Sequence, residues 1–392
     1  MAEVTNASFL KKFQDFYGVP ATAAAQAPGR LEILGNHTDY NQGFVLSCAV
    51  AQTTRFALRP VPGKTCRLID FRDNARMLFD ISDLNAAPDR NGSRYIKGMV
   101  KELVKRGVKS ITGFDAAIES CVPLSAGMSS SAALEVAAGY ALAQAFQIDL
   151  PKVEWARAGQ GVENNYLGLH TGLLDQFSSI FGKKDAMILS DFRTAEVLRT
   201  VALPPGYAIV VINSMKKHNL VDSEYNTRRA DCEEAAAILQ KLYPGVKALR
   251  DVSLEQLAAA KEKLPLRAYR RALHVVGECT RVMQAEKLLG NGDVAGFGQL
   301  LFDSHESSRV NFENSSPELD YLVELAHTIP GCLGARLSGG GFGGITIHLV
   351  KAEDAEVYAQ RVGEAFKLQQ KVFPEIIICS IGDGARAIPV EK

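Results

Sequence analysis

Three consecutive serines at the start of an alanine-rich segment are suited to binding phosphate. Ser129, Ser130 and Ser131 follow Gly127, and the residues after them predict a helix over 132–146. A helix start offers unpaired N–H groups and the positive end of the helix dipole, and a hydroxyl such as that of Ser131 can also bind a phosphate-bound Mg²⁺. No lysine follows the glycine, so this is not a Walker A loop. The alternative is a helix whose serines only cap its own first turn; the triple serine and a preceding proline favour phosphate.

A second glycine-rich segment, LSGGGFGGITI, matches the dinucleotide-binding pattern through Gly339, Gly341 and Gly344. In a dinucleotide site such a loop follows a strand and opens a helix, whereas this one runs into ITIHLV, which alternates like a strand. Closely spaced glycines still indicate backbone pressed against a neighbour. The segment therefore predicts either a ligand contact or a tight turn packed on another domain, and the sequence leaves both open.

Short polar side chains follow a predicted strand in the segment GRLEILGNHTDYN. Asn36, His37, Thr38 and Asp39 together supply the hydrogen-bond donors and acceptors that a polyhydroxylated ligand requires. The alternative is a turn rich in Asn and Asp. The histidine also suggests a triad with a serine and an aspartate, but no G-x-S-x-G elbow occurs in the chain, so hydrolase chemistry is disfavoured.

The elements that must position these motifs mix helices and strands. In the first half we expect short strands and helices over 6–17, 95–106, 132–146 and 155–168. In the second half we expect a buried strand at 208–212, a small sheet at the end, and helices over 222–241, 254–261, 267–288, 294–307, 316–328 and 354–367. A chain of 392 residues is too long for one core of ordinary size. We place the domain change near 185–205, which gives α+β domains at 1–190 and 191–392.

Composition excludes several classes of protein. The hydrophobic fraction of 47% and the charged fraction of 22% are ordinary for globular chains, which argues against disorder and fibrous repeats. With a formal net charge of zero, the chain lacks the long-range positive electrostatic field that nucleic-acid and anionic-membrane binders need. The seven cysteines contain no CxxC pair, so we expect reduced thiols and neither disulfides nor zinc. We find no signal peptide or membrane span and expect a cytoplasmic monomer.

Three motifs in this order, PGRxxxxGxHTDYNxG, PxxxGxSSSAA and SGGGFGG, resemble the GHMP superfamily of small-molecule kinases and specifically its galactokinase branch. Other segments extend the resemblance over nearly the whole chain: GLLDQFSSIFG, NSMKKHNL, SEYNTRRADCEE, RRALHVVGE and SSPELDYLV. The resemblance implies an N-terminal ribosomal-S5-like domain, a C-terminal ferredoxin-like domain and an active site between them. It also implies transfer of the ATP γ-phosphoryl group to the anomeric hydroxyl of a hexose, with galactose as the expected sugar.

Residue roles follow from the same resemblance. Asp175 in LLDQF matches the family's catalytic aspartate and Arg30 its partner arginine, while Ser131 and Glu163 would share Mg²⁺. An ordinary aspartate has a pKa of about 3.9, so Asp175 is expected to orient the sugar hydroxyl and accept its proton late. The implied sugar contacts are Asn36, His37, Asp39, Gly172, Asp175 and Tyr225, and the implied triphosphate contacts are Gly127, Ser129, Ser130 and Ser131. The glycine-rich turn would lie beside the site.

The sequence departs from the family pattern in two places. Asn36 stands where galactokinases usually have a glutamate that contacts the far hydroxyl end of the sugar, so another hexose, such as mannose or a C6- or C2-modified galactose, is an alternative substrate. Animal-type members carry a tryptophan just before the segment that begins at Tyr95, whereas the single tryptophan here is Trp155. A sugar and ATP sensor without turnover is a further alternative, but the complete serine-alanine run and the presence of Arg30 and Asp175 argue against it.

Overall fold

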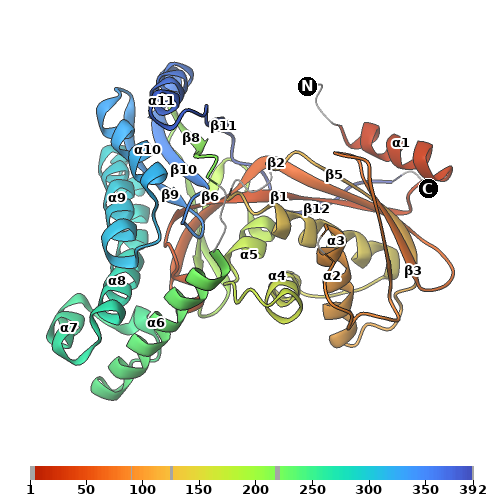
Figure 1. Ribbon diagram of the computed structural model, residues 1–392, viewed down its shortest axis with the longest axis horizontal. Coiled ribbons are helices and arrows are strands. Elements are labelled where there is room, and N and C mark those ends of the chain that lie inside the picture. The colour runs from red at the N-terminus through yellow and green to blue at the C-terminus, as the bar shows by residue number, and fades with distance from the viewer. Residues whose placement is uncertain (1–4, 90, 124–126, 217–220, 391–392) are drawn as a thin grey trace.

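Two sheets organise the chain, and helices cover each of them (Figure 1). The computed structural model describes residues 5–89, 91–123, 127–216 and 221–390, so residues 124–126 and 217–220 of the motifs above lie outside the described part. The first sheet has the order β12-β1-β2-β5-β3-β4, with β6 pairing β2 and β7 pairing β6. Its strands are β1 (Ala23–Leu34), β2 (Phe44–Pro60), β3 (Thr65–Asp70), β4 (Ala75–Asp80), β5 (Phe114–Ser120), β6 (Ala186–Asp191), β7 (Glu196–Ala202) and β12 (Arg386–Ala387).

Strand β1 is buried along its whole length because helices cover both faces of the sheet. Successive side chains of a strand point to opposite faces. Ala23, Ala25 and Ala27 accordingly enter the core under helices α2 (Ser93–Lys105), α3 (Ser130–Phe146), α4 (Lys152–Gly161) and α5 (Leu174–Phe181). Ala24 instead joins the cluster of Phe9 and Phe13 from α1 (Asn6–Tyr17), and Figure 1 shows α1 on the opposite side of the sheet from α2–α5.

Helix α3 lies directly on β1 and β2 because its inner face is made of alanine. Small side chains allow the helix to approach the sheet closely, and this close packing determines where the first turn of the helix lies relative to β1. Ser129, Ser130 and Ser131 therefore sit at the edge of the sheet, next to the middle of β1. The helix predicted over 155–168 is α4 followed by a π-helical segment, Val162–Leu167, and Trp155 is buried in the core of the first half.

The second half is a four-stranded sheet with the order β11-β8-β10-β9, covered by helices. Its strands are β8 (Tyr207–Asn213), β9 (Cys332–Ser338), β10 (Ile345–Lys351) and β11 (Glu375–Cys379). Its helices are α6 (Val221–Leu242), α7 (Leu254–Ala259), α8 (Leu266–Gly290), α9 (Val294–Ser307), α10 (Pro317–Thr328) and α11 (Ala355–Gln370). The helices and strands β8, β10 and β11 match the predicted ones within a few residues, whereas β9 was not predicted. In the described part of the chain, no helix combines the length and the apolar character of a membrane span.

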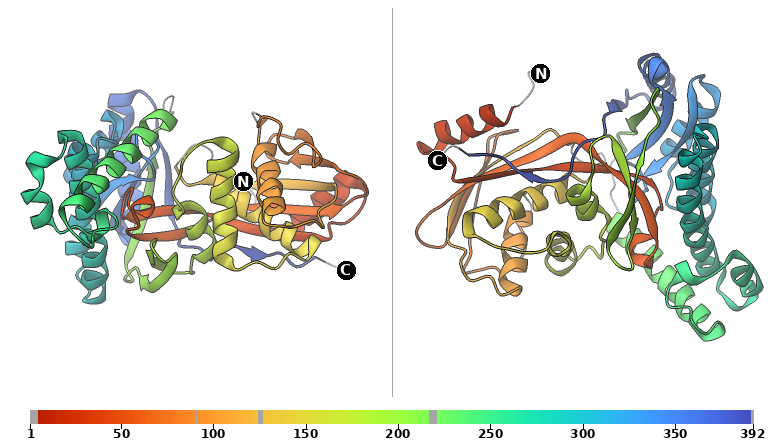
Figure 2. Two further views of the ribbon diagram at one scale, coloured as in Figure 1. Left: turned by 90° about the horizontal axis from the view of Figure 1, so that it is seen from below. Right: turned by 180° about the vertical axis from the view of Figure 1, so that it is seen from behind.

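The two sheets are not separated by a simple linker. The predicted division at 190 falls inside β6, and β6 and β7 continue the first sheet as far as Ala202. The chain also returns to the first sheet at its end, where Ala387 of β12 pairs with Ala25 of β1. Figure 2 shows this last segment lying along β1. Strand pairing therefore ties the two halves together.

Candidate functional site

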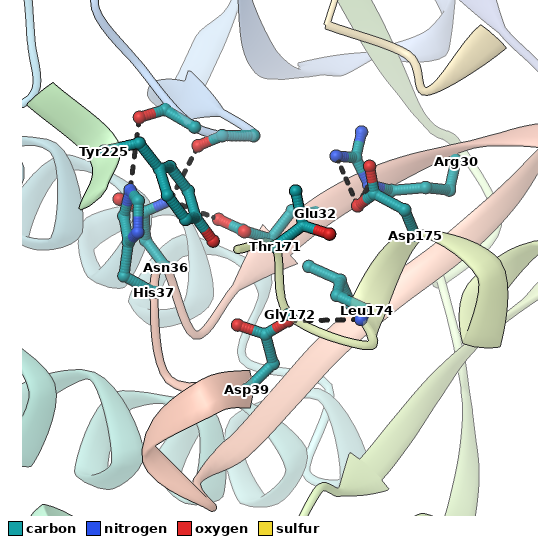
Figure 3. Close-up of a pocket in the computed structure, with 12 residues that line it drawn as sticks. Arg30, Glu32, Asn36, His37, Asp39, Thr171, Gly172, Leu174, Asp175 and Tyr225 are labelled. Carbon is teal, nitrogen blue, oxygen red and sulfur yellow. Dashed lines mark hydrogen bonds and ion pairs between the residues drawn. The ribbon is translucent and has the colours of Figure 1, made fainter. Parts of the chain in front are cut away.

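A cavity of about 190 Å³ lies where the end of β1 meets the second half of the chain. Its lining comes from β1 and the turn after it, the loop before α5, the start of α6, and the glycine-rich turn between β9 and β10 (Figure 3). The lining residues are Arg30, Glu32, Asn36, His37, Asp39, Thr171, Gly172, Leu174, Asp175, Tyr225, Gly339 and Gly340. All the residues predicted to contact the sugar are among them.

Arg30 and Asp175 form an ion pair at one wall of this cavity. The Nε and Nη2 atoms of Arg30 lie 2.8 and 2.7 Å from Oδ1 of Asp175, and Nη1 donates to the carbonyl of Gly127 at 2.6 Å. The arginine is buried, whereas the aspartate side chain is 29% exposed and so remains accessible from the cavity. The hydroxyl of Ser129 donates to Oδ2 of the same carboxylate. The aspartate is therefore held in one orientation from two sides.

The start of helix α3 lies beside this ion pair with its N–H groups free of side-chain caps. Ser129 precedes the helix in the left-handed conformation, with φ of 55°, and its side chain makes no capping hydrogen bond among the described residues. The structure therefore does not show the alternative arrangement, in which the serine side chains would only cap the first turn of their own helix. An uncapped helix start next to Arg30 is a suitable place for an anion.

Ser131 and Glu163 face each other at the beginning of α3. The hydroxyl of Ser131 lies 3.4 Å from Oε1 of Glu163, and Thr171 donates to Oε2 at 2.5 Å. Burial, with the negative charge of Asp175 nearby, raises the pKa of Glu163 to about 7. A bound cation would stabilise the ionised form of this buried carboxylate. A carboxylate oxygen and a hydroxyl oxygen side by side are ligands that Mg²⁺ accepts in proteins. These two residues therefore fit the predicted metal site.

His37 and Tyr225 form an aromatic corner of the cavity. The His37 ring stacks on Phe312 with ring centroids 4.3 Å apart, and Tyr225 lies against it at 5.0 Å. Nε2 of His37 faces the carbonyl of Gly340 at 3.1 Å and Nδ1 faces the Tyr40 hydroxyl at 2.9 Å, so Nε2 carries the proton and Nδ1 accepts. Burial lowers the pKa of His37 to about 3, which keeps the ring neutral. The corner is rigid and uncharged.

Asp39 lies against Gly172, where a larger residue would displace the Asp39 carboxylate. A Cβ on Gly172 would lie 1.7 Å from Oδ2 of Asp39, and the same oxygen accepts from the backbone N–H of Leu174 at 3.1 Å. Burial raises the pKa of Asp39. The pairing brings the polar turn after β1 into contact with the start of α5, the helix that carries Asp175.

Asn36 is fully buried and hydrogen-bonded to protein on every side. Its Nδ2 donates to Oε1 of Glu32 and to the carbonyl of Gly339, both at 2.8 Å. Its Oδ1 accepts from Asn314 at 3.0 Å. Below it, Glu278 accepts from the backbone N–H of Asn36 at 2.9 Å. Burial raises the pKa of Glu278, but the interactions with Arg281, His274 and Arg336 together outweigh burial and hold that pKa below its usual range.

The glycine-rich turn packs on the first half of the chain and lines the cavity as well. The carbonyls of Gly339 and Gly340 accept from Asn36 and His37, and a Cβ on Gly341 would lie 2.1 Å from the carbonyl of Asn314. Gly339 and Gly341 have φ of 84° and 83°, which glycine adopts without strain. The turn is therefore packed on the other half of the chain, and it runs from β9 into β10 without opening a helix, unlike a dinucleotide-binding loop.

A second cavity of about 380 Å³ opens on the other side of the α3 start. It is lined by Thr54, Arg72, Asn91, Gly92, Arg94, Tyr95, Ile118, Ser120, Ser130, Ser131 and Leu134. The Arg94 guanidinium lies 4.8 Å above the Tyr95 ring, and its Nε is buried without a hydrogen-bond partner among the described residues. Arg94 and Tyr95 therefore occupy the region in which the sequence lacks the tryptophan of animal-type members.

Sequence reasoning missed four functional side chains of the sugar-sized cavity and its support: Glu32, Thr171, Glu278 and Arg336. Glu32 was detectable, because it lies two residues after Arg30 on the same strand and so on the same face. Arg336 is fully buried in β9 and donates to Oε1 of Glu32 at 3.0 Å. Nothing in the local sequence distinguishes it from a surface arginine.

Comparison with known proteins agrees with this geometry. Family models match in three places: GHMP kinases N terminal domain at residues 94–183, the galactokinase galactose-binding signature at 11–60, and GHMP kinases C terminal at 285–368. The galactokinase of Roseiflexus sp. (strain RS-1) is 39% identical over 374 residues, which cover 95% of each chain. The galactokinase of Chloroflexus aggregans is 40% identical over 380 residues, 96% of each chain.

Solved structures give the same result. The crystal structure of Lactococcus lactis galactokinase complexed with galactose matches with a TM-score of 0.92 and 31% identity, covering 97% of this chain and 99% of that one. The mevalonate kinase of L. major shares the fold alone, with a TM-score of 0.61 and 21% identity over 92% of this chain and 97% of that one. The predicted α+β fold and the predicted family are confirmed: the chain belongs to the galactokinase family of GHMP kinases.

Proposed function

We propose that this protein is an ATP-dependent galactokinase that transfers the γ-phosphoryl group of ATP to the anomeric hydroxyl of galactose. The observation that carries the proposal is the Arg30–Asp175 ion pair, which stands between a cavity of sugar size and the uncapped start of α3. The galactokinase relatives and the galactose complex of the Lactococcus lactis enzyme support galactose as the sugar.

Asp175 and Arg30 divide the chemistry. Phosphoryl transfer has a loose transition state, so positioning and positive charge contribute more than a strong base. Asp175 accepts a hydrogen bond from the anomeric hydroxyl and takes its proton late, while Arg30 and Ser129 hold the carboxylate in place. The Arg30 guanidinium also places positive charge beside the transferring oxygens.

ATP fits the start of α3 and the cavity beyond it. The triphosphate would lie against Gly127, Ser129, Ser130 and Ser131, where backbone N–H groups and the helix dipole favour anions. Adenine would enter the cavity beside Arg94 and Tyr95, whose stacked side chains offer a flat cationic and aromatic surface.

Ser131 and Glu163 would hold a magnesium ion that accompanies ATP. When bound, the ion supplies positive charge that neutralises the phosphate oxygens. The protein's contribution is the oxygen pair itself, with Thr171 fixing the Glu163 carboxylate.

An ADP-release assay with MgATP, taken to kcat/KM over several sugars, tests the proposal. The panel is galactose, galactosamine, N-acetylgalactosamine, 2-deoxygalactose, galacturonate, glucose, mannose and talose. We expect galactose to have the highest kcat/KM. A higher value for mannose or a C6-modified sugar would refute galactose as the substrate, and tight binding of sugar and ATP without ADP release would refute the enzymatic function.

A further inference from the structure

The hydrogen-bonding capacity of Asn36 is used up before any sugar arrives. Both hydrogens of its amide are donated, one to Glu32 and one to the carbonyl of Gly339, and its oxygen accepts from Asn314 at 3.0 Å and from the Ser308 hydroxyl at 3.4 Å. The side chain is fully buried among these partners. A sugar hydroxyl could bind Asn36 only by displacing a protein hydrogen bond, which would leave a buried polar group unpaired.

Glu32 is in the opposite situation. Its Oε1 accepts from Asn36 at 2.8 Å and from Arg336 at 3.0 Å, whereas no described residue donates to Oε2. The side chain lines the cavity, and Figure 3 shows its carboxylate linked to Asn36. Burial raises the pKa of Glu32, and the guanidinium groups of Arg336 and Arg30 oppose that rise. The cavity thus contains a carboxyl group that is ion-paired to Arg336 through Oε1 and has its other oxygen available as an acceptor.

The position of Glu32 relative to Arg30 determines what it can reach. The two residues are separated by two positions on β1, which corresponds to about 6.7 Å along a strand. Asp175, which positions the anomeric hydroxyl in the proposed function, is bound to Arg30. A hydroxyl that binds Glu32 therefore belongs to the side of the hexose away from the anomeric centre.

We propose that Glu32 is the carboxylate that recognises the sugar's distal hydroxyl groups, and that Asn36 and Arg336 position it. This inference rests on the proposed function. Residue 36 still contributes to specificity, but through Glu32 and not by direct contact. A hydroxyl that donates to a carboxylate makes a charge-assisted hydrogen bond, so the choice of hexose depends on this one side chain.

The test pairs one substitution with sugars that each lack one hydroxyl. For Glu32→Gln we expect KM for galactose to rise roughly 10- to 100-fold, with a smaller change in kcat, because a charge-assisted hydrogen bond is lost. The KM increase should shrink to less than about 3-fold for one of 3-, 4- or 6-deoxygalactose and persist for 2-deoxygalactose. An equal increase for all four deoxy sugars and galactose, or no increase for any of them, would overturn the proposal.

Control variants separate recognition from folding. Glu102→Gln removes another buried, ion-paired glutamate, one that contacts Arg106 outside the cavity, and should leave the relative kcat/KM of the deoxy sugars unchanged. If a thermal melt shows that Glu32→Gln does not fold, Glu32→Asp keeps the charge and carries the same comparison. Wild-type protein that phosphorylates none of the sugars would refute the proposed function, whereas active wild type with unchanged variants would refute only the role of Glu32.

Discussion

The cavity proposed for the sugar and the cavity proposed for the nucleotide are built in different ways. The sugar cavity is about 190 Å³, draws its lining from both halves of the chain, and surrounds its ligand space with buried side chains that hold one another, as Asn36 holds Glu32. The nucleotide cavity is about 380 Å³ and is lined entirely from the first half, with Arg72 and Arg94 partly exposed. The first is preorganised for one small molecule by contacts between the two halves, whereas the second is larger and needs no contribution from the second half.

The largest effect is expected where the two cavities meet. Asp175→Asn keeps the shape of the side chain but removes its charge and its ability to accept the hydroxyl proton. We expect kcat to fall by roughly 10³-fold or more while galactose binding remains measurable by calorimetry. An unchanged kcat would remove Asp175 from the chemistry and with it the link between the cavities.

The metal site should affect only the nucleotide side. Glu163→Gln is expected to raise the Mg²⁺ concentration needed for half-maximal rate by about 10- to 100-fold, because glutamine lacks the negative charge and one of the two carboxylate oxygens, and Ser131→Ala by about 10-fold, because alanine lacks the hydroxyl. The galactose KM should stay within about 2-fold. The checks are a Mg²⁺ titration of the rate and the Mg²⁺ dependence of ATP binding; no shift in either would contradict the metal assignment.

Acid should weaken the support of the sugar cavity. Burial lowers the pKa of His37 to about 3 and that of His274, which contacts Asn36, to about 4. A histidine in the unfolded chain takes up a proton near pH 6.5, whereas these two buried rings stay neutral. The stability that the neutral rings contribute to the folded protein is therefore fully present above pH 6.5 and is lost as the pH falls from 6.5 towards the folded-state pKa values. At pH 5 the loss is about 2 kcal/mol for each ring.

Urea unfolding at pH 7.5 and pH 5.0 measures this loss. In His274→Asn the difference in unfolding free energy between the two pH values should be about 2 kcal/mol smaller than in the wild type. His170→Asn, on the surface, is the control and should leave the difference unchanged. A His274→Asn variant with the full wild-type difference would show that the buried ring does not set the acid sensitivity.

The smallest effect is expected in the cavity proposed for the nucleotide. Arg94→Ala removes the guanidinium from the Tyr95 ring and should raise the KM for ATP by roughly 3- to 10-fold, with no change in the galactose KM. Lys101→Ala, whose ammonium group lies over Tyr166 outside the cavity, serves as control. If Arg94→Ala has the same KM for ATP as the Lys101→Ala control, adenine does not bind beside Arg94.

Local patterns predicted the long elements well. The apolar spacing of α1 and the alanine run of α3 fall within two residues of the observed bounds. Strand β7 was missed because it is mostly exposed and lacks an alternating pattern, and β6 with it, since the two lie in the stretch interpreted as a domain change. Helix α5 was not predicted as a helix at all, because eight residues give little periodicity.

Site residues that lie in recognisable motifs were predicted from the sequence, and those outside the motifs were not. Arg30 and Asp175 are 145 residues apart, and only the family resemblance brought them together before the structure did. Glu278 and Arg336 escaped prediction because a charged residue in a helix or strand looks exposed until its tertiary partners are known. Asn36 was expected to contact sugar directly, and its complete set of protein partners is visible only in three dimensions.

The pairing of β12 with β1 has a consequence for synthesis of the protein. The residue that completes the pair with Ala25 is Ala387, so the edge of β1 has no partner while the ribosome is still translating the second half. Domains commonly fold in the order in which they are made. The short edge formed by Ala25 and Gln26 therefore lacks its β12 partner until almost the whole chain has been made, and an unpaired strand edge favours association with other chains.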